Sequence, residues 1–234
     1  MTEPAQATTP ELPVGPPVDP VEKMTPPARQ PLVGQFVSLL PLDADRDATG
    51  LYEISHGSTG KTQLWTYMPY GPFADAVDMK SWLQQQAQST DPLFFTVFEN
   101  NSRQPVGMVS FLAIVPAMRR LELGHIWYGP DAQRTRVNTE TIFLMLTESF
   151  DRLNYRRVEW KCDALNSRSR AAAIRLGFKY EGLFRQHIIY KGRNRDTSWY
   201  AMLDHEWSAV KANMTRWLYG DEPNLSLYQL NNPA

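Results

Sequence analysis

The stretch that decides the fold is residues 166–182, which read N-S-R-S-R-A-A-A-I-R-L-G-F-K-Y-E-G. Asn166 is a suitable helix N-cap, because its side-chain oxygen can accept from a backbone N–H two or three residues later. The alanines at 171–173 are strong helix formers. Gly177 suits the left-handed conformation that ends a helix, and Phe178 begins an aromatic run typical of a strand. The stretch therefore predicts a capped helix that leads directly into a β-strand.

This unit resembles the fourth helix of the GNAT superfamily of acetyl-CoA-dependent N-acetyltransferases, which follows the pattern N-x-x-[AS]-x(7)-G-F with a short E-G after it. The serine at 169 is similar to the Rim-type branch, whose members acetylate ribosomal-protein N-termini and have many relatives acting on small amines. The resemblance covers roughly residues 32–203. It implies transfer of an acetyl group to a primary amine of a small molecule or a protein N-terminus, by direct attack in a ternary complex. The matching residues are Asn166, Ser169, Gly177, Phe178, Glu181 and Gly182.

Composition is compatible with this enzyme class and excludes several others. The 234 residues carry a net charge of −1, so they can bury a core but have no basic excess for binding nucleic acid. The one cysteine excludes an internal disulfide and fits a reducing compartment. The longest apolar run, 106–115, is too short for a membrane span of about 20 residues, and the first residues lack a signal pattern. We expect a cytoplasmic protein, monomer or homodimer, with no membrane or nucleic-acid partner.

The two ends of the chain differ in composition from its middle. Half of the 18 prolines lie in the first 31 residues, and such a segment buries too little apolar surface to fold alone. We therefore expect residues 1–31 to be a disordered tail. Its two Pro-x-x-Pro tetrapeptides, 13–16 and 17–20, match a generic recognition motif, although a solvated linker is the commoner interpretation. Residues 220–234 are expected to be a second loose tail, and residues 32–219 one domain that ends in a helix at 204–218.

Between the tails, hydrophobic periodicity predicts an alternation of strands and helices. This order suggests a single α+β domain. The resemblance implies a central, twisted, mixed but mostly antiparallel sheet of six to seven strands flanked by helices. Strands are expected at 35–40, 93–99, 106–115, 120–128, 157–162, 178–190 and 197–203, and helices at 43–55, 79–88, 138–153, after Asn166, and at 204–218.

Two patterns suggest other chemistry. Residues 55–62, S-H-G-S-T-G-K-T, look like a phosphate-binding loop, but Ser55 replaces the first glycine and a helix precedes the segment where the motif needs a strand. Cys162 with His125 looks like a nucleophile and base. Cys162 lies in a predicted central strand, where a small buried thiol is the commoner outcome. Neither pattern is favoured.

The resemblance implies that the pyrophosphate of acetyl-CoA rests on backbone N–H groups at a helix start, in a loop of pattern [QR]-x-x-G-x-[GA]. Residues 133–138 read Q-R-T-R-V-N, so Arg136 stands at the glycine and Asn138 at the small position. Helix N-termini attract anions, so we expect phosphate binding with altered geometry, aided by Arg134 and Arg136. Arginines in contact with water are the alternative. The residues implied to bind acetyl-CoA, the co-substrate, are Ile126, Trp127, Tyr128, Gln133, Arg134, Thr135, Arg136, Val137, Asn138, Thr139, Asn166 and Ser169.

Attack of an amine on a thioester also needs a base and an oxyanion donor. The resemblance implies that the donor is a backbone N–H within 126–128, and Gly124 indicates a bulge in this strand. Glu122 is the first candidate for the base, because burial can raise the pKa of a carboxylate, and His125 is the second. Alternation places these two on opposite faces unless the bulge intervenes. An ion pair of Glu122 with an arginine and a core position for His125 are the alternatives.

The tyrosine that serves as acid in many relatives is replaced by Ala173. The resemblance implies that Ser169 donates a hydrogen bond to the departing thiolate while Asn166 holds the pantetheine arm. No metal is implied. The missing tyrosine and glycines leave open a non-catalytic acyl-CoA-binding or peptide-binding module on the same fold, or a scaffold acting through its proline-rich tail.

Aromatic residues suggest where the acceptor binds. The segment 65–73 carries Trp65, Tyr67 and Tyr70, which could stack on a cation or cover an apolar amine. Tyr190, Lys191 and Arg193, near the turn between the last two strands, are expected on the other side. Packing in the core is an equal explanation for these aromatic residues.

Overall fold

An open sheet runs through the protein, which the computed structural model describes for residues 12–20, 24–222 and 224–233. In these ranges the sheet has eight strands in the order β1-β2-β3-β4-β5-β6-β8-β7. Neighbouring strands are antiparallel except β5 and β6, which are parallel. This confirms the mixed, mostly antiparallel sheet, with one strand more than expected. The strands are β1 (Leu32–Val33), β2 (Val37–Pro41), β3 (Leu93–Glu99), β4 (Pro105–Val115), β5 (Arg120–Tyr128), β6 (Arg157–Asp163), β7 (Lys179–Tyr190) and β8 (Arg193–Leu203).

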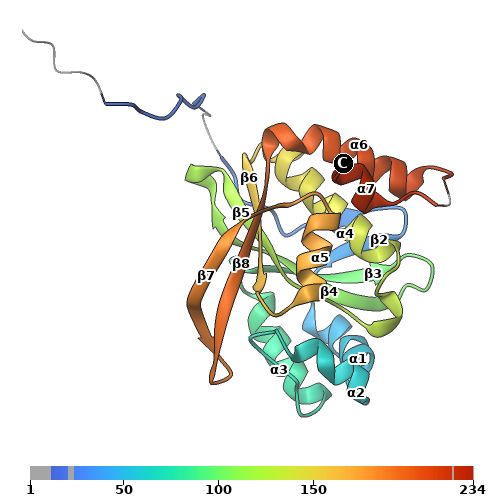
Figure 1. Cartoon of the computed structure of the whole chain (residues 1–234). Helices are drawn as coiled ribbons and strands as arrows, with labels where there is room; N and C mark the ends of the chain where they lie inside the picture. Colours follow the sequence, from blue (N-terminus) through green and yellow to red (C-terminus); the bar gives the residue numbers. More distant parts are fainter. Residues whose placement is uncertain (1–11, 21–23, 223, 234) are drawn as a thin grey trace, which may run out of the picture.

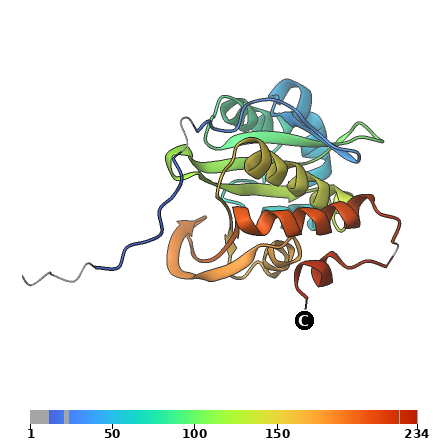
Figure 2. The ribbon, with the colours of Figure 1, turned by 90° about the horizontal axis from the view of Figure 1, so that it is seen from above.

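Helices cover both faces of this sheet (Figures 1 and 2). The larger core lies under α4, α5, α6 and α7, and a smaller, aromatic core lies under α1 and α3. Short 3-10 turns occur at Gln63–Trp65, Pro116–Met118 and Pro130–Ala132, and a π-helical turn, Glu148–Arg152, follows α4. The helices are α1 (Ala44–Ser55), α2 (Thr59–Thr62), α3 (Ala76–Ala87), α4 (Arg136–Thr147), α5 (Ser167–Arg175), α6 (Asp204–Tyr219) and α7 (Leu227–Asn231).

The helix α5 begins and ends as its sequence predicts. Asn166 Oδ1 accepts from the Ser169 N–H at 3.1 Å, which caps the helix. Gly177 has a φ of +94°, and a Cβ added there would lie 2.8 Å from Val210 Cγ2 of α6. Any side chain at this position would therefore strain the backbone and collide with a neighbouring helix.

The folded part extends beyond the expected boundaries at both ends. Met24 packs against the core, Pro27 is buried, and the Tyr155 hydroxyl donates to the Thr25 carbonyl at 3.3 Å. At the other end, Leu227 of α7 is only 2% exposed and belongs to the core. The expected tails at 24–31 and 224–233 are thus corrected to packed segments. Residues 12–20 are exposed and have no regular structure, and the rest of the expected N-terminal tail lies outside the described residues.

Several boundaries move because of local turn and cap chemistry. Thr135 caps α4, so this helix begins before residue 138, and Asp75 caps α3, so it begins before residue 79. Lys191 and Gly192 both have positive φ and form a tight turn, which lets β8 begin at Arg193 rather than at 197.

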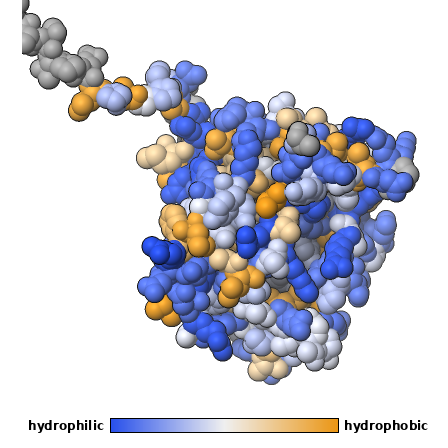
Figure 3. All heavy atoms as spheres, viewed as in Figure 1, coloured by the Kyte–Doolittle hydropathy of each residue, from blue (hydrophilic) through white to orange (hydrophobic). Residues whose placement is uncertain are grey.

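The hairpin of β7 and β8 leaves apolar side chains exposed. They gather on the left of the space-filling view, over these two strands (Figure 3). The exposed large hydrophobic residues of β7 are Tyr180, Leu183, Phe184, Ile188 and Ile189.

Candidate functional site

The two parallel strands in the middle of the sheet part from each other. β5 pairs with β6 through Arg120–Arg157, Leu121–Val158 and Glu122–Glu159, and both strands then continue beyond the last pair. Backbone groups of strands need hydrogen-bonding partners, so the diverging ends can receive an extended ligand. The gap lies in the centre of the sheet, between its β1–β5 and β6–β8 parts.

A β-bulge follows Glu122 in β5. The register against β4 shifts from Ser110–Gly124 to Met108–Trp127, which inserts one residue into β5. His125 has a φ of +52° there. The bulge expected from Gly124 is present, but the left-handed residue is the histidine rather than the glycine.

Glu122 faces the α1–α3 side of the sheet, because its neighbours Leu121 and Leu123 pack in the opposite core. Its side chain is buried, at 8% exposure, and its Oε2 accepts from Lys161 Nζ at 2.8 Å. Burial raises the pKa of Glu122, and the charge of Lys161 opposes that increase. The carboxylate is therefore in an ion pair, with a lysine rather than the arginine considered from sequence.

Lys161 holds more than one partner. Its Nζ also lies 2.8 Å from Glu159 Oε2 and 4.0 Å from the centre of the Trp199 ring. Hydrogen bonds from Lys161 and Arg157 lower the pKa of Glu159 against the effect of burial. The ammonium thus sits between two carboxylates and an aromatic face, an arrangement that sequence spacing did not indicate.

His125 lies on the same face as Glu122, because the bulge interrupts the alternation of β5. Its ring stacks on Tyr70, with centroids 5.5 Å apart, and lies 4.9 Å from the Phe94 ring. Burial lowers the pKa of His125 to about 4. A histidine with so low a pKa is a weak base, and its packing matches the core alternative. Glu122 is the stronger candidate.

The residues expected near the sulfur lie at the start of α5. Ser169 Oγ accepts from Trp160 Nε1 at 3.0 Å, so the serine proton remains available to another acceptor. Cys162 is buried in the α4–α7 core, and burial raises the pKa of its thiol. Because His125 faces the other side of the sheet, the two residues do not form a nucleophile and base pair.

The expected phosphate site lies at the start of α4. Gln133 Nε2 donates to the Tyr128 carbonyl at 3.0 Å and ties this loop to the end of β5. Thr135 Oγ1 accepts from the Val137 N–H, and the other N–H groups of the first turn have no partner within the helix. Arg134 is exposed, with a φ of +63°. Arg136 is exposed and stacks over the Phe36 ring at 5.0 Å, which favours the alternative proposed for it.

Polar groups between α4 and α5 fit a ligand with hydrogen-bonding atoms. Asn138 Oδ1 is a buried acceptor that has no hydrogen-bond partner among the described residues. Arg175, which sequence reasoning missed, donates to Thr139 Oγ1 at 3.0 Å, and burial lowers its pKa. A coenzyme bearing amides and phosphates would satisfy such groups, so the donor set fits acetyl-CoA.

The aromatic segment 65–73 closes the α1–α3 side of the site. Trp65 is 1% exposed and belongs to the core, so packing is the correct explanation for it. Tyr70 stacks on Trp82 at 4.1 Å and on His125. Tyr67 donates to the Leu165 carbonyl at 3.2 Å. Only Tyr67 and Tyr70 of the three therefore lie at the edge of the expected acceptor side.

The tip of the β7–β8 hairpin docks on this segment. Lys191 Nζ donates to the carbonyls of Trp65 and Tyr70, at 2.8 and 3.1 Å. The hydroxyl of Tyr190 donates to Asp163 Oδ2 at 2.9 Å. The hairpin tip thus lies against the segment that carries Tyr67 and Tyr70, and Tyr190 is next to Lys191 in the chain. That these residues line the acceptor side stays a prediction.

The phosphate-loop pattern of the sequence lies apart from these residues. The Gly-Lys-Thr of residues 60–62 belongs to the short helix α2, which follows α1 rather than a strand, so the phosphate-loop pattern is excluded.

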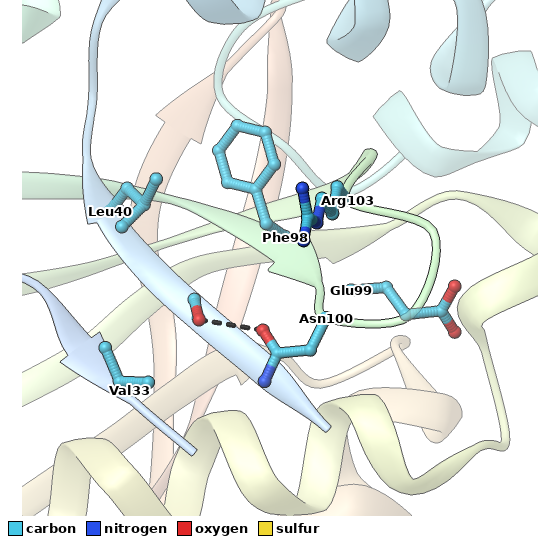
Figure 4. Close-up of a pocket in the computed structure, with 7 residues that line it drawn as sticks. Val33, Leu40, Phe98, Glu99, Asn100 and Arg103 are labelled. Atoms are coloured by element: carbon cyan, nitrogen blue, oxygen red, sulfur yellow. Dashed lines mark hydrogen bonds between the residues drawn. The ribbon is translucent and has the colours of Figure 1, made fainter. Parts of the chain in front are cut away.

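A hollow of about 460 Å³ lies at the outer edge of the sheet, over β2 and β3 (Figure 4). It is lined by Val33, Ser38, Leu40, Phe98, Glu99, Asn100 and Arg103.

Comparison with known proteins agrees with this geometry. The model of the acetyltransferase (GNAT) domain matches residues 37–179. The chain belongs to the GNAT family. Family membership confirms the enzyme class expected from the sequence, an N-acetyltransferase.

Three proteins are similar to this chain in sequence or in structure. A GCN5-related N-acetyltransferase from Brucella melitensis is 36% identical, with a TM-score of 0.85 over 89% of this GNAT chain and 96% of that one. The "Putative ribosomal N-acetyltransferase YdaF" of Bacillus subtilis (strain 168) is 29% identical over 105 residues, which are 45% of this chain and 57% of that protein. The Microcin C7 self immunity acetyltransferase MccE, solved with acetyl-CoA and AMP, is 25% identical, with a TM-score of 0.64 over 73% of this chain and 93% of that one.

The name of the Bacillus subtilis relative, "Putative ribosomal N-acetyltransferase YdaF", agrees with the Rim-type resemblance of the helix α5. This chain matches little more than half of that relative's length. Within the described residues, no helix is long and apolar enough to cross a membrane. The same residues contain no group of three or more His, Cys, Asp or Glu that could hold a metal ion.

Proposed function

We propose that this protein transfers an acetyl group from acetyl-CoA to a primary amine of a small molecule or a protein N-terminus, by direct attack within a ternary complex. The observation that carries the proposal is the buried Glu122, on the α1–α3 face, at the last pair before β5 and β6 part. Acetyl-CoA enters from the α4 and α5 side, and the amine from the side of Tyr70 and the β7–β8 hairpin. The two substrates meet across the diverging strands.

Glu122 removes the proton from the attacking amine. Its raised pKa favours this role, because a base is most effective when its pKa is near the working pH. Lys161 keeps enough negative charge on the carboxylate for it to accept a proton. The lowered pKa of His125 makes that residue the weaker choice.

A backbone N–H within Ile126–Tyr128 stabilises the oxyanion. The bulge at His125 supports this assignment, because it turns the backbone of β5 away from a regular ladder just before these residues. A rigid backbone donor costs little reorganisation during the reaction.

The departing thiolate receives a hydrogen bond from Ser169. The indole N–H of Trp160 already donates to the Ser169 oxygen, which leaves the hydroxyl proton directed elsewhere. Asn166 keeps its Oδ1 for the helix cap, so only its amide NH2 remains for the pantetheine arm.

Acetyl-CoA supplies the activated acetyl group. Its pyrophosphate is held by the N–H groups at the start of α4, and Asn138 and Arg175 add polar contacts between α4 and α5. Arg134 is the exposed side chain best able to add charge there. Arg136 contributes less, because it packs on Phe36.

A thermal shift with acetyl-CoA measures binding, and thiol release with a panel of amines and N-terminal peptides measures turnover. Wild-type protein is expected to be stabilised by acetyl-CoA and to release thiol. Glu122→Gln should keep the thermal shift but lose about a hundredfold or more in kcat. Binding without thiol release for every amine would instead support the non-catalytic module.

Ser169→Ala should lower kcat about tenfold with little change in the KM for acetyl-CoA, because a thiolate is a tolerable leaving group and needs only modest help. The matched control is Ser167→Ala, an exposed position at the start of the same helix. Unchanged turnover in Ser169→Ala would remove the serine from the mechanism.

A further inference from the structure

A half-buried arginine lies on the acceptor face without an acidic partner. Arg195 is in β8, and its Nε donates to Thr197 Oγ1 at 3.2 Å. The guanidinium carbon lies 6.0 Å from the centre of the Tyr190 ring. These two contacts fix the direction of the side chain and leave its terminal Nη groups free to bind another molecule.

The face on which Arg195 lies is that of Glu122. Thr197 pairs with Asp163 and Trp199 pairs with Lys161 across β8 and β6. Paired residues of neighbouring strands point to the same face, and alternation adds Arg195 to this row. Since Lys161 bonds Glu122, the arginine and the carboxylate share one surface. The charge of Arg195 is near enough to lower the pKa of Glu122.

Among the described residues, no carboxylate lies within 4.0 Å of the Arg195 guanidinium. The nearby acids have other partners. Asp163 accepts from Tyr190 and from the Leu165 N–H, and Asp196 accepts from the Gln186 N–H. A partly desolvated cation without a counter-ion is unfavourable unless an anion binds it.

We propose that the acceptor is a small primary amine that also carries a carboxylate or a phosphate, and that Arg195 binds this anion while the amine lies at Glu122. Two Nη groups match the paired oxygens of either anion. Lys191 adds positive charge to the same side and disfavours cationic polyamines, whereas the charge of Lys161 is balanced by Glu122 and Glu159. This inference rests on the proposed acetyl transfer and specifies its acceptor.

Matched pairs of amines test the charge requirement. One pair is an α-amino acid and its amide, and the other is phosphoethanolamine and ethanolamine. Wild-type protein should show a kcat/KM at least about tenfold higher for the anionic member of one pair, and the pair that responds distinguishes carboxylate from phosphate. Arg195→Gln should remove this preference by raising the acceptor KM, without changing the KM for acetyl-CoA.

Two further variants separate recognition from folding. Arg195→Lys keeps the charge without the paired Nη geometry and should retain part of the preference. Arg185→Gln makes the same charge change at an exposed position of the neighbouring strand β7 and should behave as wild type. Thermal unfolding of all three shows whether they remain folded.

Different results would contradict the anion site at Arg195 and the proposed acetyl transfer. Wild-type protein that acetylates neutral and anionic amines equally, or Arg195→Gln that keeps the preference, overturns the anion site alone. Protein that binds acetyl-CoA but acetylates no amine overturns the proposed transfer, and the anion site fails with it.

Discussion

Glu122, Lys161 and Glu159 form a buried group of alternating charge in which each residue affects the others. Lys161 Nζ lies 2.8 Å from an oxygen of each carboxylate. Lys161 lowers the pKa of Glu122, whereas the negative charge of Glu159 raises it. Substitution of the two neighbours should therefore shift the Glu122 pKa in opposite directions, and the pH dependence of activity should follow these shifts if Glu122 is the base and not if its role is structural.

Lys161→Met removes the attraction that favours ionised Glu122, so the acid limb of the kcat/KM profile should move to higher pH. Glu159→Gln removes a repulsion and should move the same limb to lower pH. A displacement of about one pH unit in each direction is the expected size for a neighbouring charge in a partly buried site. The measurement is the pH dependence of kcat/KM between pH 5 and 9, with Lys179→Met, an exposed lysine, as the control. Shifts in the same direction for both variants would contradict the assignment of Glu122 as the base.

At the scale of elements, a single carboxylate joins α4 to the start of the sheet. Glu140 is fully buried, and its oxygens accept from the backbone N–H groups of Gln35, Phe36 and Val37 at 2.6 to 2.9 Å. The Tyr219 hydroxyl at the end of α6 donates to it at 2.7 Å. A Cβ at Gly34 would lie 2.6 Å from this carboxylate, so the turn before β2 depends on both residues.

Glu140→Gln replaces two acceptor oxygens with one and buries an amide against N–H donors. We expect the free energy of unfolding to fall by about 2–4 kcal/mol, because hydrogen bonds to a charged acceptor are among the stronger ones and their loss leaves buried donors unpaired. Tyr219→Phe, which removes one of the four contacts, should cost about 1 kcal/mol. Urea unfolding measures both, with exposed Glu53→Gln as the control at under about 0.5 kcal/mol. A change in Glu140→Gln no larger than in that control would show that the carboxylate does not hold these elements together.

The elements that sequence predicted well are those with strong local signals. The cap and glycine of α5, and the strand bounds at 93–99 and 120–128, depend on neighbouring residues, and the structure agrees with them. The packing of α7 was missed because it depends on contacts with residues distant in the sequence. The start of β8 was missed because it depends on the tight turn at Lys191 and Gly192, which the sequence analysis did not place.

In the candidate site, too, the features that depend on local sequence were predicted and those that depend on the tertiary structure were not. The bulge at residues 124–125 follows from a glycine in a strand. The partners of Glu122 and the isolation of Arg195 depend on which strands become neighbours, and β6 lies beside both β5 and β8 only after the chain has folded. Sequence periodicity gives the face of each residue within a strand, but not the residue across from it.

At the scale of the whole molecule, the proposed acceptor side is assembled from two distant parts of the chain. The segment 65–73 comes from the first half, and the β7–β8 hairpin comes from the second (Figure 1). Lys191 joins them through the carbonyls of Trp65 and Tyr70, and burial lowers the pKa of its amine. Tyr67 adds a third contact, to the Leu165 carbonyl before α5. The relative position of the two parts therefore sets the shape of the surface on which we propose that the amine binds.

Lys191→Met should weaken the contact between the hairpin tip and segment 65–73 and leave the sheet and α4 intact. The substitution removes two hydrogen bonds and keeps a side chain of similar length. We expect the acceptor KM to rise by about tenfold, with little change in the KM for acetyl-CoA, because the coenzyme side is built from α4 and α5. Hydrogen exchange of the backbone amides in 65–73 should become faster, whereas that of β3 and β4 should not change. Lys179→Met removes a lysine at the other end of β7 and should alter neither quantity. If Lys191→Met raised the KM values of both substrates equally, the hairpin would affect the whole fold rather than the acceptor side, and the division of the site between the two faces of the sheet would be wrong.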